Sequence, residues 1–148
     1  ELQSLHLLDA ALLVLVGAQH PLAAAERIRI ADLAGDTWVI TGAKETPGLR
    51  EFIVQTCRLS GFQPIFAPPV HTIESVLARV ATGYGVCLWP EFLAASFPAN
   101  PLVRYLHSDC PSIELRAVWH RREESPLLQQ FLGILRRRVA EAAPAAAS

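Results

Sequence analysis

Two loops that carry threonine hydroxyls lead into stretches with helical periodicity. Residues 41–47 (TGAKETP) precede the first stretch, and residues 70–72 (VHT) precede the second. The first N–H groups of a helix lack partners within the helix and lie at the positive end of its dipole, so a helix start can hold a small anion. Alternatively, Thr46 and Thr72 only cap their helices, since threonine is a common N-cap residue. Residue types alone leave both interpretations open.

No catalytic motif accompanies these loops. The sequence holds no GxSxG and no Walker A loop, and the GYG at 83–85 precedes a run of strand length, the wrong context for a dinucleotide turn. No two histidines lie four residues apart, and no carboxylate stands at a ligand spacing, so we expect no metal and no cofactor. A Cys/His nucleophile pair stays open because such partners meet in space. We expect a protein that is not an enzyme.

The three cysteines, Cys57, Cys87 and Cys110, form no CxxC pair and are odd in number. This pattern argues against a disulfide framework and a zinc knot, so we expect reduced thiols. Cys57 falls on the apolar face of a predicted helix and Cys87 falls inside an apolar strand, which predicts buried, inert thiols. Cys110 lies in a polar loop and is expected to be the accessible one.

The elements that must position the two loops alternate between strands and helices. Apolar runs predict strands at 11–16, 37–41, 64–70, 86–89, 102–107 and 114–120. Helical spacing predicts a short turn at 30–34 and helices at 47–60, 73–81, 91–96 and 126–142, with Pro47 at the first helical position and Gly61 as the C-terminal glycine. This alternation predicts an α/β fold around a mostly parallel sheet flanked by helices. The runs 102–107 and 114–120 are expected to pair as neighbouring strands.

Composition excludes several classes of protein. The 148 residues are 51% hydrophobic, which suits one domain with a core and not a disordered chain. Thirteen Lys and Arg against fourteen Asp and Glu leave a net charge of −1, so the chain alone has no positive field to hold a phosphate backbone. The near-apolar run 5–16 is shorter than the ~20 residues of a membrane span, and no basic secretory segment precedes Arg27. We therefore expect no membrane partner and a cytoplasmic location.

Six sequence pieces in a fixed order support a more specific interpretation. They are HPLA (20–23), IADLAG (30–35), WVITG (38–42), TPGLREFIVQTCRLSGFQP (46–64), TIESVLARVATGYGVCLWP (72–90) and AVWHRREESPLLQQFLGILR (117–136). Together they resemble the effector-binding domain of LysR-type transcriptional regulators. The resemblance implies a type 2 periplasmic-binding-protein-like fold in which subdomain two is complete and subdomain one is partial. Residues 1–17 would end subdomain one and form a crossover strand, 18–112 would form subdomain two, 113–142 would return to subdomain one, and 143–148 would be a disordered tail.

The resemblance also implies a function, the sensing of a small-molecule effector in a cleft between subdomains. The implied site has one wall of loop residues and a second group behind it: Thr41, Gly42, Thr46 and Pro47, with His71, Thr72, Ile73 and Glu74. Glu74 would oppose an anionic effector, which would then need Lys44 or groups outside this chain. The implied partners are further copies in a homo-oligomer, and DNA only through an N-terminal domain that this chain lacks. The alternative is a solute-binding protein of a transporter, which shares the fold.

The C-terminal stretch predicts a helix with an apolar stripe. The stripe consists of Leu128, Phe131, Leu132, Leu135 and Val139. In the family that the chain resembles, these residues would pack against elements that precede Glu1. We therefore expect the stripe to drive self-association or to be covered by the chain folding back, because exposed apolar stripes are usually covered.

Overall fold

A computed structural model describes residues 1–97, 99–122 and 125–142. The chain divides into two compact units, of which unit 1 comprises Glu1–Ala10 and Ile113–Ser148 and unit 2 comprises Ala11–Ser112. In the part of the chain described, no helix has both the length and the apolar character needed to cross a membrane.

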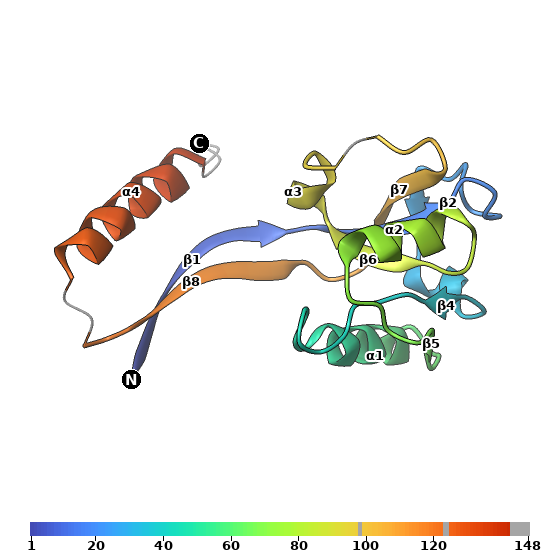
Figure 1. The fold of residues 1–148 in the computed structure, drawn as a ribbon, viewed down its shortest axis with the longest axis horizontal. Coiled ribbons are helices and arrows are strands. Elements are labelled where there is room, and N and C mark those ends of the chain that lie inside the picture. Colours follow the sequence, from blue (N-terminus) through green and yellow to red (C-terminus); the bar gives the residue numbers. More distant parts are fainter. Residues whose placement is uncertain (98, 123–124, 143–148) are drawn as a thin grey trace, which may run out of the picture. The chain divides into compact units, whose positions relative to one another are not determined.

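Unit 2 is built on a four-stranded sheet in the order β3-β7-β2-β6 (Figure 1). Its strands are β3 (Arg27–Ile28), β7 (Val103–Ser108), β2 (Leu12–Gly17) and β6 (Cys87–Pro90). Strand β2 is antiparallel to both β6 and β7, whereas β3 is parallel to β7. All six residues of β2 are buried, because this strand has neighbours at both edges and is covered on both faces.

Two short parallel strands extend this sheet, β4 (Thr37–Trp38) and β5 (Ile65–Phe66). A parallel bridge joins Trp38 to Val86, and Val86 N donates to Thr37 O at 2.8 Å. This close approach explains why residue 85, the second glycine of the GYG turn, has no side chain. A Cβ on Gly85 would lie 2.3 Å from Thr37 O, a distance that no side chain tolerates.

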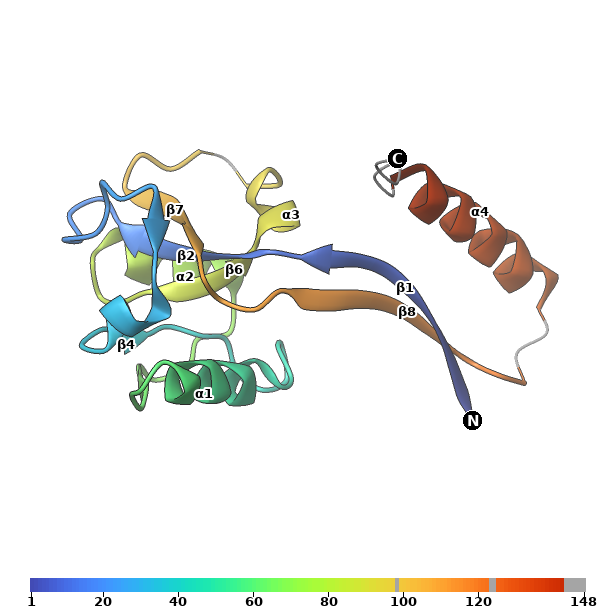
Figure 2. The same cartoon turned by 180° about the vertical axis from the view of Figure 1, so that it is seen from behind.

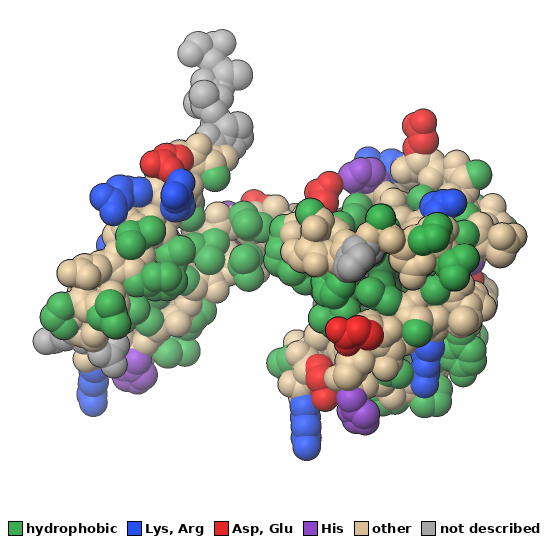
Figure 3. Space-filling model, turned by 45° about the horizontal axis from the view of Figure 1, so that its top comes forward, with side chains coloured by type: hydrophobic (Ala, Val, Ile, Leu, Met, Phe, Trp, Pro, Cys, Tyr) green, Lys and Arg blue, Asp and Glu red, His purple; other side chains and the backbone are tan. Residues whose placement is uncertain are grey.

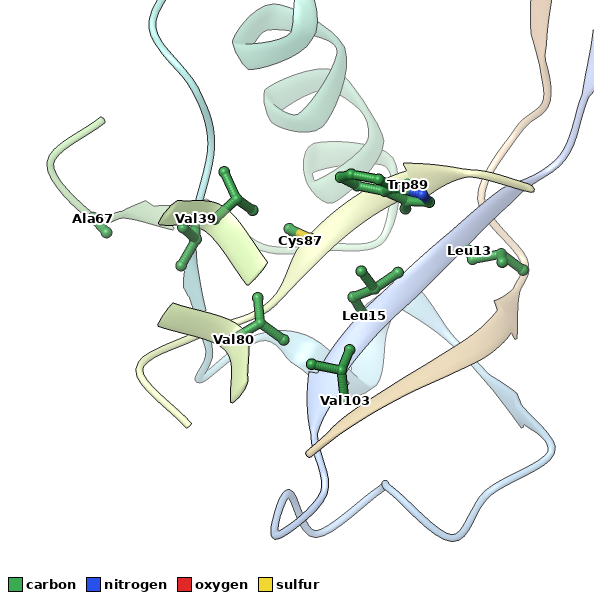
Figure 4. Packing of buried hydrophobic residues seen from close by; sticks show 9 residues of the cluster. Leu13, Leu15, Val39, Ala67, Val80, Cys87, Trp89 and Val103 are labelled. Carbon is green, nitrogen blue, oxygen red and sulfur yellow. The ribbon is translucent and has the colours of Figure 1, made fainter. Parts of the chain in front are cut away.

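The main core of unit 2 lies between the sheet and helix α2 (Ile73–Ala81), which lies across one face of the sheet in both views (Figures 1 and 2). Side chains from β2, β6, β7 and α2 meet there (Figure 4). The cluster comprises Leu13, Leu15, Val39, Ala67, Val76, Val80, Cys87, Trp89 and Val103. Helix α1 (Leu49–Leu59), a 3₁₀ turn η1 (Ile30–Leu33) and the short helix α3 (Glu91–Ala94) complete the unit. The fold therefore surrounds a buried central strand with helices, as expected for an α/β protein.

Unit 1 is a two-stranded ribbon with one helix. Strands β1 (Leu2–Ala10) and β8 (Ile113–His120) run side by side and antiparallel, with an irregularity between His6 and Leu8 (Figure 2). Helix α4 (Pro126–Ala142) contacts β1 and buries Leu132, which is 2% exposed. The remaining stripe residues of α4 are half-buried or exposed, so the fold of unit 1 covers Leu132 and leaves the rest of the stripe partly in water.

Two expectations about the strands are also wrong. The sheet is mixed rather than mostly parallel, because β2 takes antiparallel partners at both edges. The runs 102–107 and 114–120 do not pair: β7 pairs with β2 and β3, and β8 pairs with β1. The physical reason is burial. Strand β2 is apolar throughout and gains a buried neighbour in β7, whereas the mostly exposed β8 finds a strand of matching length in β1.

Helix α1 begins two residues later than predicted. Its N-cap is Gly48, which has a φ of 82°, and its first residue is Leu49, so Thr46 is not an N-cap and Pro47 is not the first helical residue. The reason is that residues 42–46 form their own turn, in which Gly42 O accepts from the N–H groups of Glu45 and Thr46. The predicted C-terminal glycine is confirmed, since Gly61 has a φ of 91°. The predicted disorder of 143–148 lies outside the described residues.

Candidate functional site

A cavity of about 110 Å³ lies in unit 2 where the loop after β4 leads into α1. Its lining combines that loop, the first turn of α1 and one proline: Ile40, Thr41, Gly42, Ala43, Thr46, Gly48, Arg50, Glu51 and Pro69. Three residues that the sequence singled out, Thr41, Gly42 and Thr46, are therefore brought together at one cavity.

The hydroxyl groups of Thr41 and Thr46 are hydrogen-bonded, with their Oγ1 atoms 2.6 Å apart. Thr41 is 8% exposed, and the neighbouring Gly42 N–H donates to Val70 O at 3.1 Å, which fixes the start of the loop. Two hydroxyls that share one hydrogen bond leave one O–H without a protein acceptor among the described residues. This hydrogen can be donated to a bound group in the cavity.

The second loop lies beside the first. A parallel bridge joins Thr41 to Val70, and His71 Nδ1 lies 3.5 Å from Glu45 Oε1. The His71 side chain is 85% exposed, so this contact contributes little to stability. The structure thus brings the two predicted loops together but leaves the imidazole in solvent.

The other predicted site residues do not line this cavity. Thr72 is the N-cap of α2, and its Oγ1 accepts from Ser75 N at 3.2 Å, so the predicted cap is confirmed. Ile73 and Glu74 follow in the exposed first turn, and Pro47 is exposed as well. A role for Pro47, His71, Thr72, Ile73 or Glu74 in binding stays a prediction.

Sequence reasoning missed two charged residues of the lining, Arg50 and Glu51. The Cζ of Arg50 lies 4.0 Å from the centre of the Phe66 ring, a cation–π contact between α1 and β5. Both residues lie in the first turn of α1, which begins at Leu49. The contact with Phe66 depends on the packing of α1 beside β5, which leaves no local signal in the sequence.

The environment of the three cysteine thiols does not make them reactive. Cys57 and Cys87 are buried, as predicted, and burial raises the pKa of these thiols to about 11 and about 12. Cys110 is half-buried, and burial raises its pKa to about 12 despite an opposing hydrogen bond from the Thr56 side chain. A thiol is nucleophilic as the thiolate, so all three are unreactive near neutral pH.

A second, larger cavity of about 640 Å³ lies elsewhere in unit 2. It is lined by turns around Gly17, His20, Asp36, Gly83 and Gly85, and Asp36 Oδ1 accepts from His20 Nε2 at 3.0 Å.

Within residues 1–97, 99–122 and 125–142, no group of three or more His, Cys, Asp or Glu has a metal-binding arrangement.

Comparisons with known proteins identify the family. The family model described as the LysR substrate binding domain matches residues 1–140, and the chain belongs to this family. Among curated proteins, the chain is 28% identical over 140 residues to the Hca operon transcriptional activator HcaR of Escherichia coli K12, covering 95% of this chain and 47% of HcaR. The chain therefore spans about half the length of this relative.

Solved structures support the same fold. The regulatory domain of CcmR from Synechocystis PCC6803, solved in complex with 2-PG, has a TM-score of 0.78 at 22% identity, with 98% of this chain and 70% of that chain covered. Full-length CbnR complexed with its target DNA has a TM-score of 0.79 at 16% identity, with 93% of this chain and 48% of CbnR covered. These similarities confirm the expected α/β fold of the type 2 periplasmic-binding-protein-like class.

Proposed function

We propose that this chain is the effector-sensing domain of a DNA-binding transcription regulator and that it is not an enzyme. The observation that carries the proposal is the family match over residues 1–140, together with a relative that is a transcriptional activator. A similar regulatory domain binds a small molecule, 2-PG. Family membership favours this function over a solute-binding protein of a transporter, the alternative that shares the fold.

The proposed effector wall is the cavity at Thr41, Gly42 and Thr46. It has a pair of hydrogen-bonded hydroxyls, of which that of Thr41 is on a buried side chain and that of Thr46 on an exposed one, together with a loop fixed by backbone hydrogen bonds and an O–H group available for donation. Pro47, His71, Thr72, Ile73 and Glu74 are proposed to line the wider site around it. If an effector binds one conformation of the regulator more tightly than another, it shifts the population towards that conformation.

The proposed partners are further copies of the chain, in a homo-oligomer, and DNA. The DNA contact is assigned to a domain outside these 148 residues, since CbnR was solved on its target DNA and the present chain has a net charge of −1. Residues 1–17 and 113–142 are proposed to belong to subdomain one and its crossover, and 18–112 to subdomain two. A regulator that acts on chromosomal DNA works in the cytoplasm, which is the proposed location.

Effector titration of the complete regulator tests this function. Replacing Thr41→Val and Thr46→Val removes both hydroxyls while keeping the side-chain shape, and the affinity should fall by about 1–3 kcal/mol. The control is Thr82→Val, since the Thr82 hydroxyl donates to Ala78 O at the end of α2, away from the cavity. Calorimetry that gives equal affinities for the double variant and the control would contradict the assignment. Operator binding that does not respond to any bound small molecule would contradict the sensing function.

A further inference from the structure

We propose that the cavity at Thr41 and Thr46 selects a negatively charged head group of carboxylate size, and that Arg50 is the cation that selects it. The inference rests on the proposed function, because it names the chemistry of the effector at the same site. Arg50 lies on helix α1 and not in the loop that carries Thr41 and Thr46.

The guanidinium of Arg50 is held in place but electrostatically unpaired. It lies over the Phe66 ring with Cζ 4.0 Å from the ring centre, and it lines the cavity. Among the described residues, no hydrogen bond or ion pair joins it to a carboxylate or a carbonyl, and Arg50 is exposed to water. A planar guanidinium has five N–H donors, and stacking on a ring leaves the donors at its edge free. Arg50 therefore presents unused donors next to the cavity.

The polar groups that can reach a ligand are mainly donors. One hydroxyl hydrogen of the Thr41–Thr46 pair has no protein acceptor, and it lies at the same cavity as the Arg50 guanidinium. A ligand group with several acceptor oxygens and a negative charge satisfies both kinds of donor, and a carboxylate does so with two oxygens in one plane. Lys44, the cation that the sequence offers for this role, does not line the cavity, whereas Arg50 does.

The size of the cavity limits what enters it. At about 110 Å³ it is well below the ~300–1,000 Å³ of pockets that enclose a drug-sized ligand. It fits a head group of a few heavy atoms, and the rest of the effector lies outside it. Glu51 is the one carboxylate of the lining, and it opposes an anion; its place in the first turn of α1 suits the helix dipole.

Matched pairs of small acids and their neutral amides test the inference on this chain. The probes are acetate and acetamide, benzoate and benzamide, and succinate and succinamide. Binding is followed by the backbone amide resonances of residues 41–51 in NMR titrations. At least one acid should bind about tenfold or more tightly than its amide, the effect of one charge-assisted interaction. Arg50→Gln should abolish this preference, whereas Arg58→Gln, the same charge change on the same helix, should retain it.

The outcomes separate this inference from the proposed function. If no acid binds more tightly than its amide, or if Arg50→Gln retains the preference, the anionic head group is refuted. Amide binding that persists at residues 41–51 would then still support the effector site. Glu51→Gln should tighten acid binding, because it removes a repulsive charge. Weaker acid binding in this variant would overturn the inference, because the loss of a negative charge beside a bound anion cannot weaken the electrostatic attraction.

Discussion

The imidazole of His20 donates from Nε2 to Asp36 Oδ1 at 3.0 Å, across a sequence separation of sixteen residues. The other ring nitrogen, Nδ1, accepts from the N–H of Leu22 at 3.1 Å, so the ring proton must lie on Nε2. His20 therefore joins the turn after β2 to the segment before β4. This geometry gives the HPLA piece a structural role, because both ring nitrogens are already used.

Replacing His20→Ala should destabilise unit 2. The change leaves the Leu22 N–H and one Asp36 oxygen without their partner in a part-buried site, which costs about 1–3 kcal/mol of the free energy of unfolding. His71→Ala is the control, because that imidazole is largely exposed and should change stability by less than about 0.5 kcal/mol. Equal midpoints for the two variants in urea unfolding would show that the His20 hydrogen bonds contribute nothing.

The two threonines that the sequence offered as caps should behave differently. Thr72→Ala removes the acceptor for Ser75 N at the start of α2 and should cost about 1 kcal/mol. Thr46→Ala should not have the cost of a lost cap, since Gly48 is the N-cap of α1. Thr46→Ala does lose the hydrogen bond to Thr41, and Thr41→Val loses the same bond. Thermal unfolding of the three variants separates the two effects, and a larger loss for Thr46→Ala than for Thr41→Val would contradict the assigned helix start.

The sequence predicts the elements of unit 2 better than their pairing. Strand β2 and helices α2 and α4 appear close to their expected places, because their apolar periodicity and flanking turn residues act locally. Strand β1 was not predicted, since its leucines do not alternate and its stability comes from pairing with β8, more than a hundred residues away. Long-range partners of this kind leave no local signal.

The candidate site shows the same limit. Residue type and a place before a helix predict Thr41 and Thr46 as site residues, and the structure joins them by a hydrogen bond. Arg50 was not found, because its contact with Phe66 depends on α1 packing beside β5. The sequence therefore predicts the threonine loop, whereas the place of the Arg50 guanidinium at the cavity depends on tertiary packing.

The buried thiol of Cys87 should make stability fall at alkaline pH. Its pKa is raised from 9.0 to about 12 in the folded chain, so below pH 9 the thiol is protonated in both states. As the pH rises above 9, only the unfolded chain releases the proton, and the free energy of unfolding falls by up to ~1.4 kcal/mol per pH unit until the pH reaches about 12. Urea unfolding between pH 8 and 11, under reducing conditions, should show a steeper fall for the native chain than for Cys87→Ala. Parallel curves would contradict the raised pKa.

The exposed apolar face of unit 1 should drive self-association. Leu127, Phe131 and Ile134 on α4 are each about half or more exposed, and an apolar groove of about 570 Å³ runs between α4 and Trp119. Hydrophobic side chains also gather on the face of this unit that Figure 3 shows. Each large apolar side chain left in water forgoes roughly 1.5–3 kcal/mol of burial, so contact with a second surface is favourable.

Replacing Leu127→Gln, Phe131→Gln and Ile134→Gln together should therefore shift the chain towards monomer. Glutamine keeps the helix propensity close to that of leucine, so α4 should remain helical by circular dichroism. Leu59→Gln is the control, since Leu59 is 86% exposed but lies on α1 in unit 2. Sedimentation equilibrium should give a higher apparent mass for the native chain and for Leu59→Gln than for the triple variant. A native chain that sediments as a monomer at every concentration would show that this face does not associate.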